Sequence, residues 1–266
     1  MEPGENQLRV LVLGSGTSVG VPTIGCNCDV CTSDDPRDNR LRPSVVFQYG
    51  GHSVLVDTTP DFRQQALRYE LRRVDGILFT HSHADHILGL DDIRPYNFRQ
   101  KDPIPIYAAG DTMDAIQNVF RYAFCENEVK THIPKLDPVR LTGEPFELFG
   151  RTVTPIPLMH GKNPIFGYRI GPVAYLTDHS EIPEASFPLL EGLDVLFLDA
   201  LRHKPHPTHS TVDRSLGHVE RLKPKRAFFT HIAHDLSHSR TEARLPEHVR
   251  LAYDGLEFSV EFGDAS

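Results

Sequence analysis

The 266-residue sequence has no tryptophan, three methionines and only four cysteines. Four cysteines are too few for a disulfide-bonded scaffold, so we expect the fold to depend on an apolar core. No apolar run approaches the roughly 20 residues that span a bilayer, and the first residues lack the basic and then apolar pattern of a secretory signal. We therefore expect a cytoplasmic protein that has no membrane partner.

Basic residues are also fewer than acidic residues. The chain has 28 Lys and Arg against 36 Asp and Glu, which gives a net charge of −8 with histidine neutral. This balance argues against a surface that binds polyanions, so nucleic acid is not an expected partner. One residue type is abundant, however, because the chain has 15 histidines. Metal binding is therefore the first hypothesis to test.

The order of apolar segments predicts an α/β layered fold. No repeat or flexible linker divides residues 1–266, so we expect a single domain. Helices are predicted at Asp61–Leu71, Thr112–Phe120, Val212–Leu222 and Pro246–Tyr253, and no prediction is made for Phe124–Thr142. Strands are predicted at Leu8–Leu13, Ser44–Tyr49, Ser53–Val56, Gly76–Thr80, Ile104–Ala108, Val153–Leu158, Ile165–Ile170, Val173–Thr177, Val195–Leu198 and Arg226–Thr230.

Four of the predicted strands run directly into a side chain that can bind a metal. These side chains are His81, His160, Asp178 and His231. The first of them opens the dense cluster Thr80-His81-Ser82-His83-Ala84-Asp85-His86. If the strands lie in packed sheets, their carboxyl ends can meet at one rim, where a rigid scaffold positions loop residues. Solvated loop histidines are the alternative, but that reading does not account for the density of the cluster.

The His-x-His-x-Asp-His pattern over residues 81–86 resembles the signature of the metallo-β-lactamase fold superfamily of hydrolases. The resemblance implies a four-layer αββα sandwich with two divalent metal ions, Mn or Zn, and a hydroxide between them as nucleophile. It assigns His81, His83 and His160 to one ion, Asp85, His86 and His231 to the other, and Asp178 to both. Asp85 is expected to take part in catalysis as well as in metal binding.

A second acid follows another predicted strand, in the segment Leu55-Val56-Asp57-Thr58-Thr59. This segment is similar to a further motif of the same superfamily. We expect Asp57 to orient the histidine loop through hydrogen bonds. The alternative is an ordinary strand-end turn with a solvated carboxylate.

Three of the four cysteines, Cys26, Cys28 and Cys31, fall in the loop at about residues 25–32. This clip resembles that of the phosphoribosyl cyclic phosphodiesterases of phosphonate degradation. The resemblance implies a structural zinc ion whose fourth ligand is His234. The alternative is three reduced thiols without a metal, whereas Cys125 is expected to be an ordinary, partly buried thiol.

The segment His206-Pro207-Thr208-His209-Ser210-Thr211 is similar to the catalytic-acid region of phosphodiesterases, tRNase Z included. The resemblance makes His209 the acid that protonates the leaving group. A histidine that caps the helix beginning near Thr211 is the alternative, and His203 and His206 are interpreted as ordinary loop residues. The glycine-rich turn Gly14–Gly20 lacks the third glycine of a dinucleotide loop, and we expect its amides to face the rim.

Together these motifs predict hydrolysis of a small, cyclic phosphodiester, such as phosphoribosyl 1,2-cyclic phosphate. Candidate contacts for a second phosphate on that substrate are Arg42, Arg63, Arg94 and Tyr96. Two alternatives stay open, a tRNase Z-like endoribonuclease and a non-catalytic carrier resembling the fold's member in pyrroloquinoline quinone biosynthesis. Whether the chain forms a homodimer is also left open.

Overall fold

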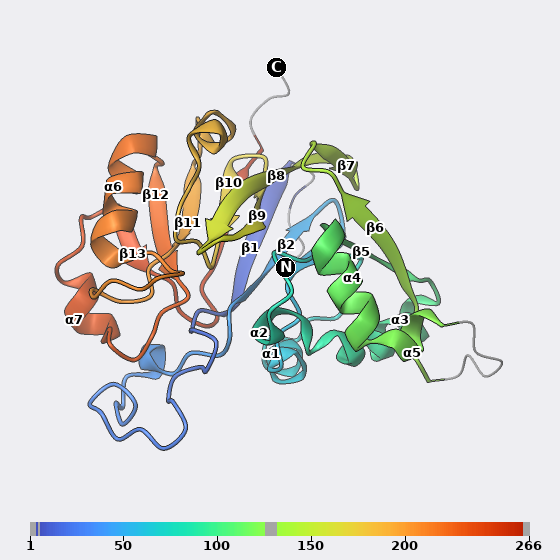
Figure 1. Cartoon of the computed structure of the whole chain (residues 1–266), viewed down its shortest axis with the longest axis horizontal. Coiled ribbons are helices and arrows are strands. Elements are labelled where there is room, and N and C mark those ends of the chain that lie inside the picture. The colour runs from blue at the N-terminus through green and yellow to red at the C-terminus, as the bar shows by residue number, and fades with distance from the viewer. Residues whose placement is uncertain (1–3, 5, 126–131, 263–266) are drawn as a thin grey trace.

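Two seven-stranded sheets pack face to face, and helices cover both outer faces (Figure 1). The structure is a computed structural model that describes residues 4, 6–125 and 132–262. The expected four-layer αββα sandwich is therefore confirmed.

The first sheet holds the N-terminal strands and the last strand of the chain. Its strands, in spatial order, are β14 (Glu257–Glu261), β1 (Gln7–Gly14), β2 (Ser44–Tyr49), β3 (His52–Val56), β4 (Gly76–Leu78), β5 (Ile104–Ala109) and β6 (Leu136–Leu141). The second sheet runs through β13 (Val249–Leu251), β12 (Arg226–Thr230), β11 (Val195–Asp199), β10 (Val173–Leu176), β9 (Asn163–Ile170), β8 (Arg151–His160) and β7 (Phe146–Leu148).

The helices are divided between the two outer faces. The face of the first sheet is covered by α1 (Phe62–Arg68), α2 (Ala84–Ile87), η2 (Leu90–Ile93), α3 (Arg94–Gln100), α4 (Gly110–Val119) and α5 (Arg121–Phe124). The face of the second sheet carries η3 (Glu184–Leu190), α6 (Val212–Leu222) and α7 (His238–Glu242), while η1 (Pro36–Asp38) lies in the N-terminal loop. In the parts of the chain that the structure describes, no helix is long and apolar enough to cross a membrane.

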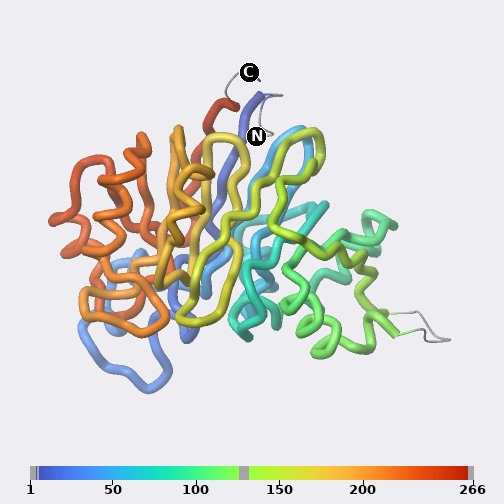
Figure 2. The backbone as a smooth tube through the Cα atoms, turned by 45° about the horizontal axis from the view of Figure 1, so that its top comes forward, coloured from blue at the N-terminus to red at the C-terminus, as the bar shows by residue number. Residues whose placement is uncertain are grey.

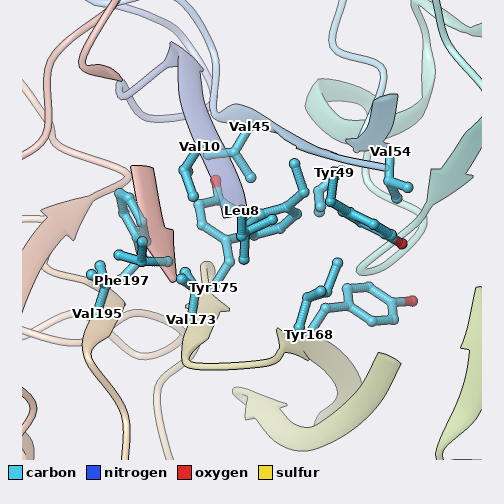
Figure 3. Packing of buried hydrophobic residues seen from close by; sticks show 14 of the residues in the cluster. Leu8, Val10, Val45, Tyr49, Val54, Tyr168, Val173, Tyr175, Val195 and Phe197 are labelled. Atoms are coloured by element: carbon cyan, nitrogen blue, oxygen red, sulfur yellow. The ribbon is translucent and has the colours of Figure 1, made fainter. Parts of the chain in front are cut away.

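Central strands such as β10 and β11 are buried on both faces, and alternate side chains enter different layers. In β10, Val173 and Tyr175 pack between the sheets, whereas Ala174 and Leu176 pack against the outer helices. This is the two-residue period of a pleated strand. Figure 3 shows the central layer, where Tyr175 and its neighbours on the second sheet face the strands of the first sheet.

The carboxyl ends of the strands that precede the predicted site residues reach one rim. Strands β3 and β4 are parallel, as are β10, β11 and β12, and β8 runs in the same direction as β10 because each pairs antiparallel with β9. Two contacts join the sheets at this rim. The amide of Phe166 donates to the Thr80 carbonyl (3.1 Å), and the Tyr168 hydroxyl donates to the Phe79 carbonyl (2.7 Å).

The predicted helix at Pro246–Tyr253 is wrong, because the structure has strand β13 there, parallel to β12. Val249 and Leu251 are buried and Arg250 between them is exposed, which is the alternation of a strand. Helix α1 is also shorter than predicted, since it ends at Arg68. In the segment left without a prediction, residues 126–131 lie outside the described residues, and the remainder contains strand β6.

Candidate metal centre

The structure brings the seven predicted ligands of the two ions together at the rim. They form two groups, and within each group the candidate ligand atoms all lie within 4.8 Å of one another. The first group is His81, His83 and His160, and the second is Asp85, His86, Asp178 and His231. Strand ends position only some of these ligands. Asp85 and His86 are positioned by the short helix α2 and not by a loop.

Asp178 stands between the two groups. Its Oδ2 atom lies 3.2 Å from Nε2 of His231, 3.3 Å from Nε2 of His86 and 4.0 Å from Nε2 of His81. These three histidines hold the pKa of Asp178 well below its ordinary value, although burial acts in the opposite direction. The carboxylate is therefore ionised and faces ligands of both groups, as a bridging ligand must.

Three site residues leave their strands in the left-handed backbone region. The φ angles of Asp57, Asp178 and His231 are 62°, 56° and 56°. Residues other than glycine adopt this region rarely, and strained backbone of this kind is concentrated at functional sites. Each of the three follows the end of a strand, at the rim where the ligand groups lie.

Asp57 is fully buried and bonded to the histidine loop, so the alternative of a solvated acid is wrong. Its carboxylate accepts from the Thr80 amide (2.9 Å), from the Thr80 hydroxyl (2.8 Å) and from Nδ1 of His86 (2.7 Å). The bond to His86 leaves Nε2 of that ring for the centre. This geometry is the one expected of a residue that orients the loop.

The donor set fits divalent metal ions. The buried Nε2 atoms of His86 and His231 make no hydrogen bond within the described residues. Carboxylate oxygens nevertheless stand 3.2–3.3 Å from them, close to the roughly 3.4 Å between two ligands of a tetrahedral zinc ion. Burial lowers the pKa of His160 to about 4 and that of His81 well below its usual range, so both rings are neutral and can coordinate a metal.

The acidic cluster has the opposite effect on the other two histidines. Burial alone would lower the pKa of His231, but Asp178 and Asp85 raise it to about 9. The pKa of His86 is raised in the same way by Asp178, Asp85 and Asp57 against the effect of burial. The carboxylates of the site therefore favour positive charge beside these two rings.

His209 lies beside this centre and is held by an acid that the sequence pattern did not single out. Its Nδ1 atom donates to Oδ2 of Asp199 at 2.7 Å. The ring stacks on His231, with centroids 4.5 Å apart, and its centroid lies 4.8 Å from that of His160. Thr211, not His209, caps α6 by accepting from the Arg214 amide, so the capping alternative is wrong.

Two further residues support the centre. Asp199 is fully buried at the end of β11, and the Thr208 carbonyl accepts from Nδ1 of His160 at 2.8 Å. The signal for Asp199 was in the sequence, because the predicted strand Val195–Leu198 also runs directly into an acid. Nothing in the sequence pattern marked Thr208, whose role comes from its backbone carbonyl.

The cysteine clip meets His234 in space. The Nδ1 atom of His234 lies 3.2, 3.5 and 3.3 Å from the sulfur atoms of Cys26, Cys28 and Cys31. One ring nitrogen cannot share three hydrogen bonds, whereas these separations are near the roughly 3.6 Å between sulfur and nitrogen ligands of a tetrahedral zinc ion. Figure 2 shows the N-terminal loop, in blue, against the later segments, in orange and red.

A buried arginine fixes the turn that carries His234. The Arg40 guanidinium donates to the carbonyl of Ala233 (3.1 Å) and to that of Leu236 (2.8 Å), on either side of His234. Asp38 balances its charge at 2.8 Å. Arg40 comes from the same N-terminal part of the chain as the three cysteines, so this part of the chain also positions their partner His234.

Comparison with known proteins places this geometry in a family. The family model of the β-lactamase superfamily domain matches residues 52–232. The chain belongs to this superfamily. Within it, the chain is 52% identical to a solved structure described as a new diphosphatase from the PhnP family, with a TM-score of 0.91, and the match covers 96% of this chain and 98% of the other. The resemblance to the hydrolases of phosphonate-degradation type is thereby confirmed.

Of two other relatives of this chain, one is a longer protein and the other has a lower sequence identity. A protein of Porphyromonas gingivalis named octanoyltransferase is 37% identical over 258 residues, which are 96% of this chain but 52% of that protein. The chain thus spans about half of its length, and the name refers to the whole protein. Zinc-bound PqqB from Methylobacterium extorquens shares the fold, with a TM-score of 0.75 at 20% identity over 94% of this chain and 99% of that one.

Backbone amides that were expected to face the rim bind other parts of the chain. In the glycine-rich turn the amides of Ser15, Gly16 and Thr17 donate to Asp254, to the Leu41 carbonyl and to the Ile232 carbonyl. The expectation that this turn offers amides to the rim is therefore wrong for these three residues. The turn instead binds the backbone next to His231.

Three of the four candidate contacts for a second phosphate are also occupied. Tyr96 is buried and donates to the Leu71 carbonyl at 2.8 Å. Arg42 forms an ion pair with Asp61, and Arg94 forms one with Asp91. Arg63 lines a cavity of about 710 Å³ between α1 and α3. No contact of the described residues joins these side chains to the ligand groups.

If Cys26, Cys28, Cys31 and His234 hold a structural zinc ion, replacing Cys28 with serine is expected to remove it and to lower the melting temperature by about 5–10 °C. A structural zinc ion contributes folding free energy, and a loss of about 3 kcal/mol shifts a domain of this size by roughly that amount. Elemental analysis and thermal unfolding check this, with Cys125→Ser as the control. Turnover per folded molecule should change less than threefold, and a large loss of turnover without loss of stability would make the clip catalytic.

Proposed function

We propose that the chain is a metal-dependent phosphodiesterase that hydrolyses a small, cyclic phosphodiester such as phosphoribosyl 1,2-cyclic phosphate. The observation that carries the proposal is the position of His209. A histidine held by a buried acid lies against the ligand groups, where it can reach a leaving group bound at the metals. Metal ligands with an adjacent proton donor suit phosphoryl transfer to water.

The proposed ligands follow the two groups described above. One ion is assigned to His81, His83 and His160, the other to Asp85, His86 and His231, with Asp178 shared, and a structural zinc ion to Cys26, Cys28, Cys31 and His234. When bound, the two ions at the rim would polarise phosphoryl oxygens and make water acidic enough to supply hydroxide. The donor set suits Mn or Zn.

The side chains of this chain have separate tasks in the proposed reaction. Asp199 fixes Nδ1 of His209, so the proton that His209 can transfer is on Nε2, and it goes to the departing oxygen. Asp57 and the Thr208 carbonyl hold the rings of His86 and His160 through their Nδ1 atoms. Asp85, whose side chain is 11% exposed, is more accessible to water than Asp178, whose side chain is 2% exposed, so we assign Asp85 a part in holding the attacking water.

A compact substrate is favoured over RNA. The chain carries a net charge of −8, and nothing in its sequence provides a basic arm that would grip a tRNA. A non-catalytic carrier would need neither His209 beside the centre nor the buried acid that holds it. A phosphoanhydride in a small molecule is the second candidate, because the 52%-identical relative is a diphosphatase.

A substrate panel tests the proposal. The protein loaded with Mn or Zn should hydrolyse phosphoribosyl 1,2-cyclic phosphate with a kcat/KM at least tenfold above those for a diphosphate diester and for precursor tRNA. Higher activity on the diphosphate diester would establish the second candidate. Two exchangeable ions per chain without hydrolysis of any of these substrates would contradict a phosphodiesterase.

A further inference from the structure

The segment between β11 and His209 has an unusual charge pattern. Residues 201–209 include Arg202, His203, Lys204, His206 and His209 but no acid, in a chain that has eight more acids than bases. This segment, which we name the basic loop, joins Asp199 to His209 and therefore passes directly beside the metal centre.

The backbone of the basic loop is held in place at several points. Arg202 donates to the carbonyls of Lys204 (3.2 Å) and Pro205 (3.1 Å), so its guanidinium supports the loop itself. At the far end, Thr208 accepts from His160 through its carbonyl. The loop is therefore bonded to a proposed metal ligand, and these hydrogen bonds fix the backbone that carries its other side chains.

His206 is positioned by the same threonine. Its Nδ1 atom accepts from the Thr208 amide (3.4 Å) and lies 3.2 Å from the Thr208 hydroxyl. With Nδ1 acting as an acceptor, the ring proton is on Nε2, which is then a free donor. The ring centroid lies 5.0 Å from that of His209, and the side chain is only half-buried. The interpretation of His206 as an ordinary loop residue is therefore replaced by that of a positioned donor beside His209.

Lys204 is exposed on the same loop. Among the described residues no carboxylate forms an ion pair with it, whereas Lys225, for example, pairs with Asp194 at 2.8 Å. An ammonium group without an acidic partner and an imidazole N–H, two residues apart, are suitable donors for one phosphate group. The predicted contacts Arg42, Arg94 and Tyr96, in contrast, already have partners.

We infer that the basic loop, through Lys204 and His206, binds a second, terminal phosphate group of the substrate on the leaving-group side of His209. This inference rests on the proposed function and narrows it to phosphodiesters that carry such a phosphate. Lys204 and His206 belong to neither ligand group, so their proposed role is binding of substrate and not of metal.

A matched pair of substrates tests the inference. Ribose 1,2-cyclic phosphate with and without a 5-phosphate differs only in the group that the basic loop would bind. In Lys204→Ala and His206→Ala, kcat/KM for the 5-phosphorylated substrate should fall by about 10- to 100-fold, the effect of losing a charge-assisted hydrogen bond, and change less than threefold for the other. His206→Gln, which retains an N–H donor, should restore part of the loss.

Lys225→Ala is the matched control, because Lys225 precedes β12 and so lies at the opposite end of this strand from His231. Equal losses on both substrates, or no loss on either, would overturn the inference. If the wild-type protein hydrolyses neither substrate, the proposed function fails, and calorimetric binding of ribose 5-phosphate to the metal-loaded protein decides the inference separately. Binding that weakens at least fivefold in both variants supports it, and unchanged binding overturns it.

Discussion

Replacing Asp178 with asparagine is expected to lower turnover of the phosphodiester at least a thousandfold while the chain stays folded. Asp178 is the carboxylate that faces histidines of both ligand groups, at 3.2 Å from His231 and 4.0 Å from His81. A neutral amide cannot replace the charge that would balance two dications. Two bound ions would stabilise the transition state by several kcal/mol, and about 4 kcal/mol corresponds to a thousandfold in rate.

Asparagine is the informative substitution because of the backbone at this position. The φ angle of Asp178 is 56°, and asparagine tolerates the left-handed region better than alanine does. Circular dichroism should therefore match that of the wild type, and the metal content should fall below two exchangeable ions per chain. Asp194→Asn is the control, because Asp194 pairs with Lys225 and belongs to neither ligand group. Turnover within tenfold of the wild type would remove Asp178 from the catalytic centre.

The proposed ligands could be predicted from the sequence because each signal was local. His81, Asp178 and His231 follow apolar strands and His160 ends one, and parallel strands of one sheet end at the same edge. The four-layer arrangement came from the resemblance rather than from the strand pattern itself. The structure contributes the direction of β8, which runs parallel to β10 only through its antiparallel pairing with β9.

The features that the sequence did not predict depend on contacts between distant segments. The left-handed turn at Asp57 is one such feature, because φ angles of this sign are not encoded by residue type alone. The bond from His160 to the Thr208 carbonyl is another, since any residue could supply that atom. Strand β13 was predicted as helix because three residues are too few to show a clear period.

Replacing His209 with alanine is expected to slow substrates that have poor leaving groups about a thousandfold and activated aryl phosphodiesters less than tenfold. A general acid matters only where the departing oxygen needs a proton, and such catalysis contributes about 10²–10⁴ in rate. Parallel measurements of kcat on a cyclic sugar phosphate and on a nitrophenyl phosphodiester check this. An equal loss on both would show that His209 binds the phosphate or a metal ion instead.

Asp199 supplies the second arm of that experiment, because it is fully buried and acts on the centre through its bond to His209. If the role of Asp199 is to hold this imidazole, Asp199→Asn alone should reduce turnover of the substrate with the poor leaving group. Combining it with His209→Ala should cause little further loss of turnover. Such non-additivity is the mark of two residues that act as one unit. Losses that multiply would mean that Asp199 acts mainly on His231, whose Nδ1 atom lies 3.8 Å from the same carboxylate.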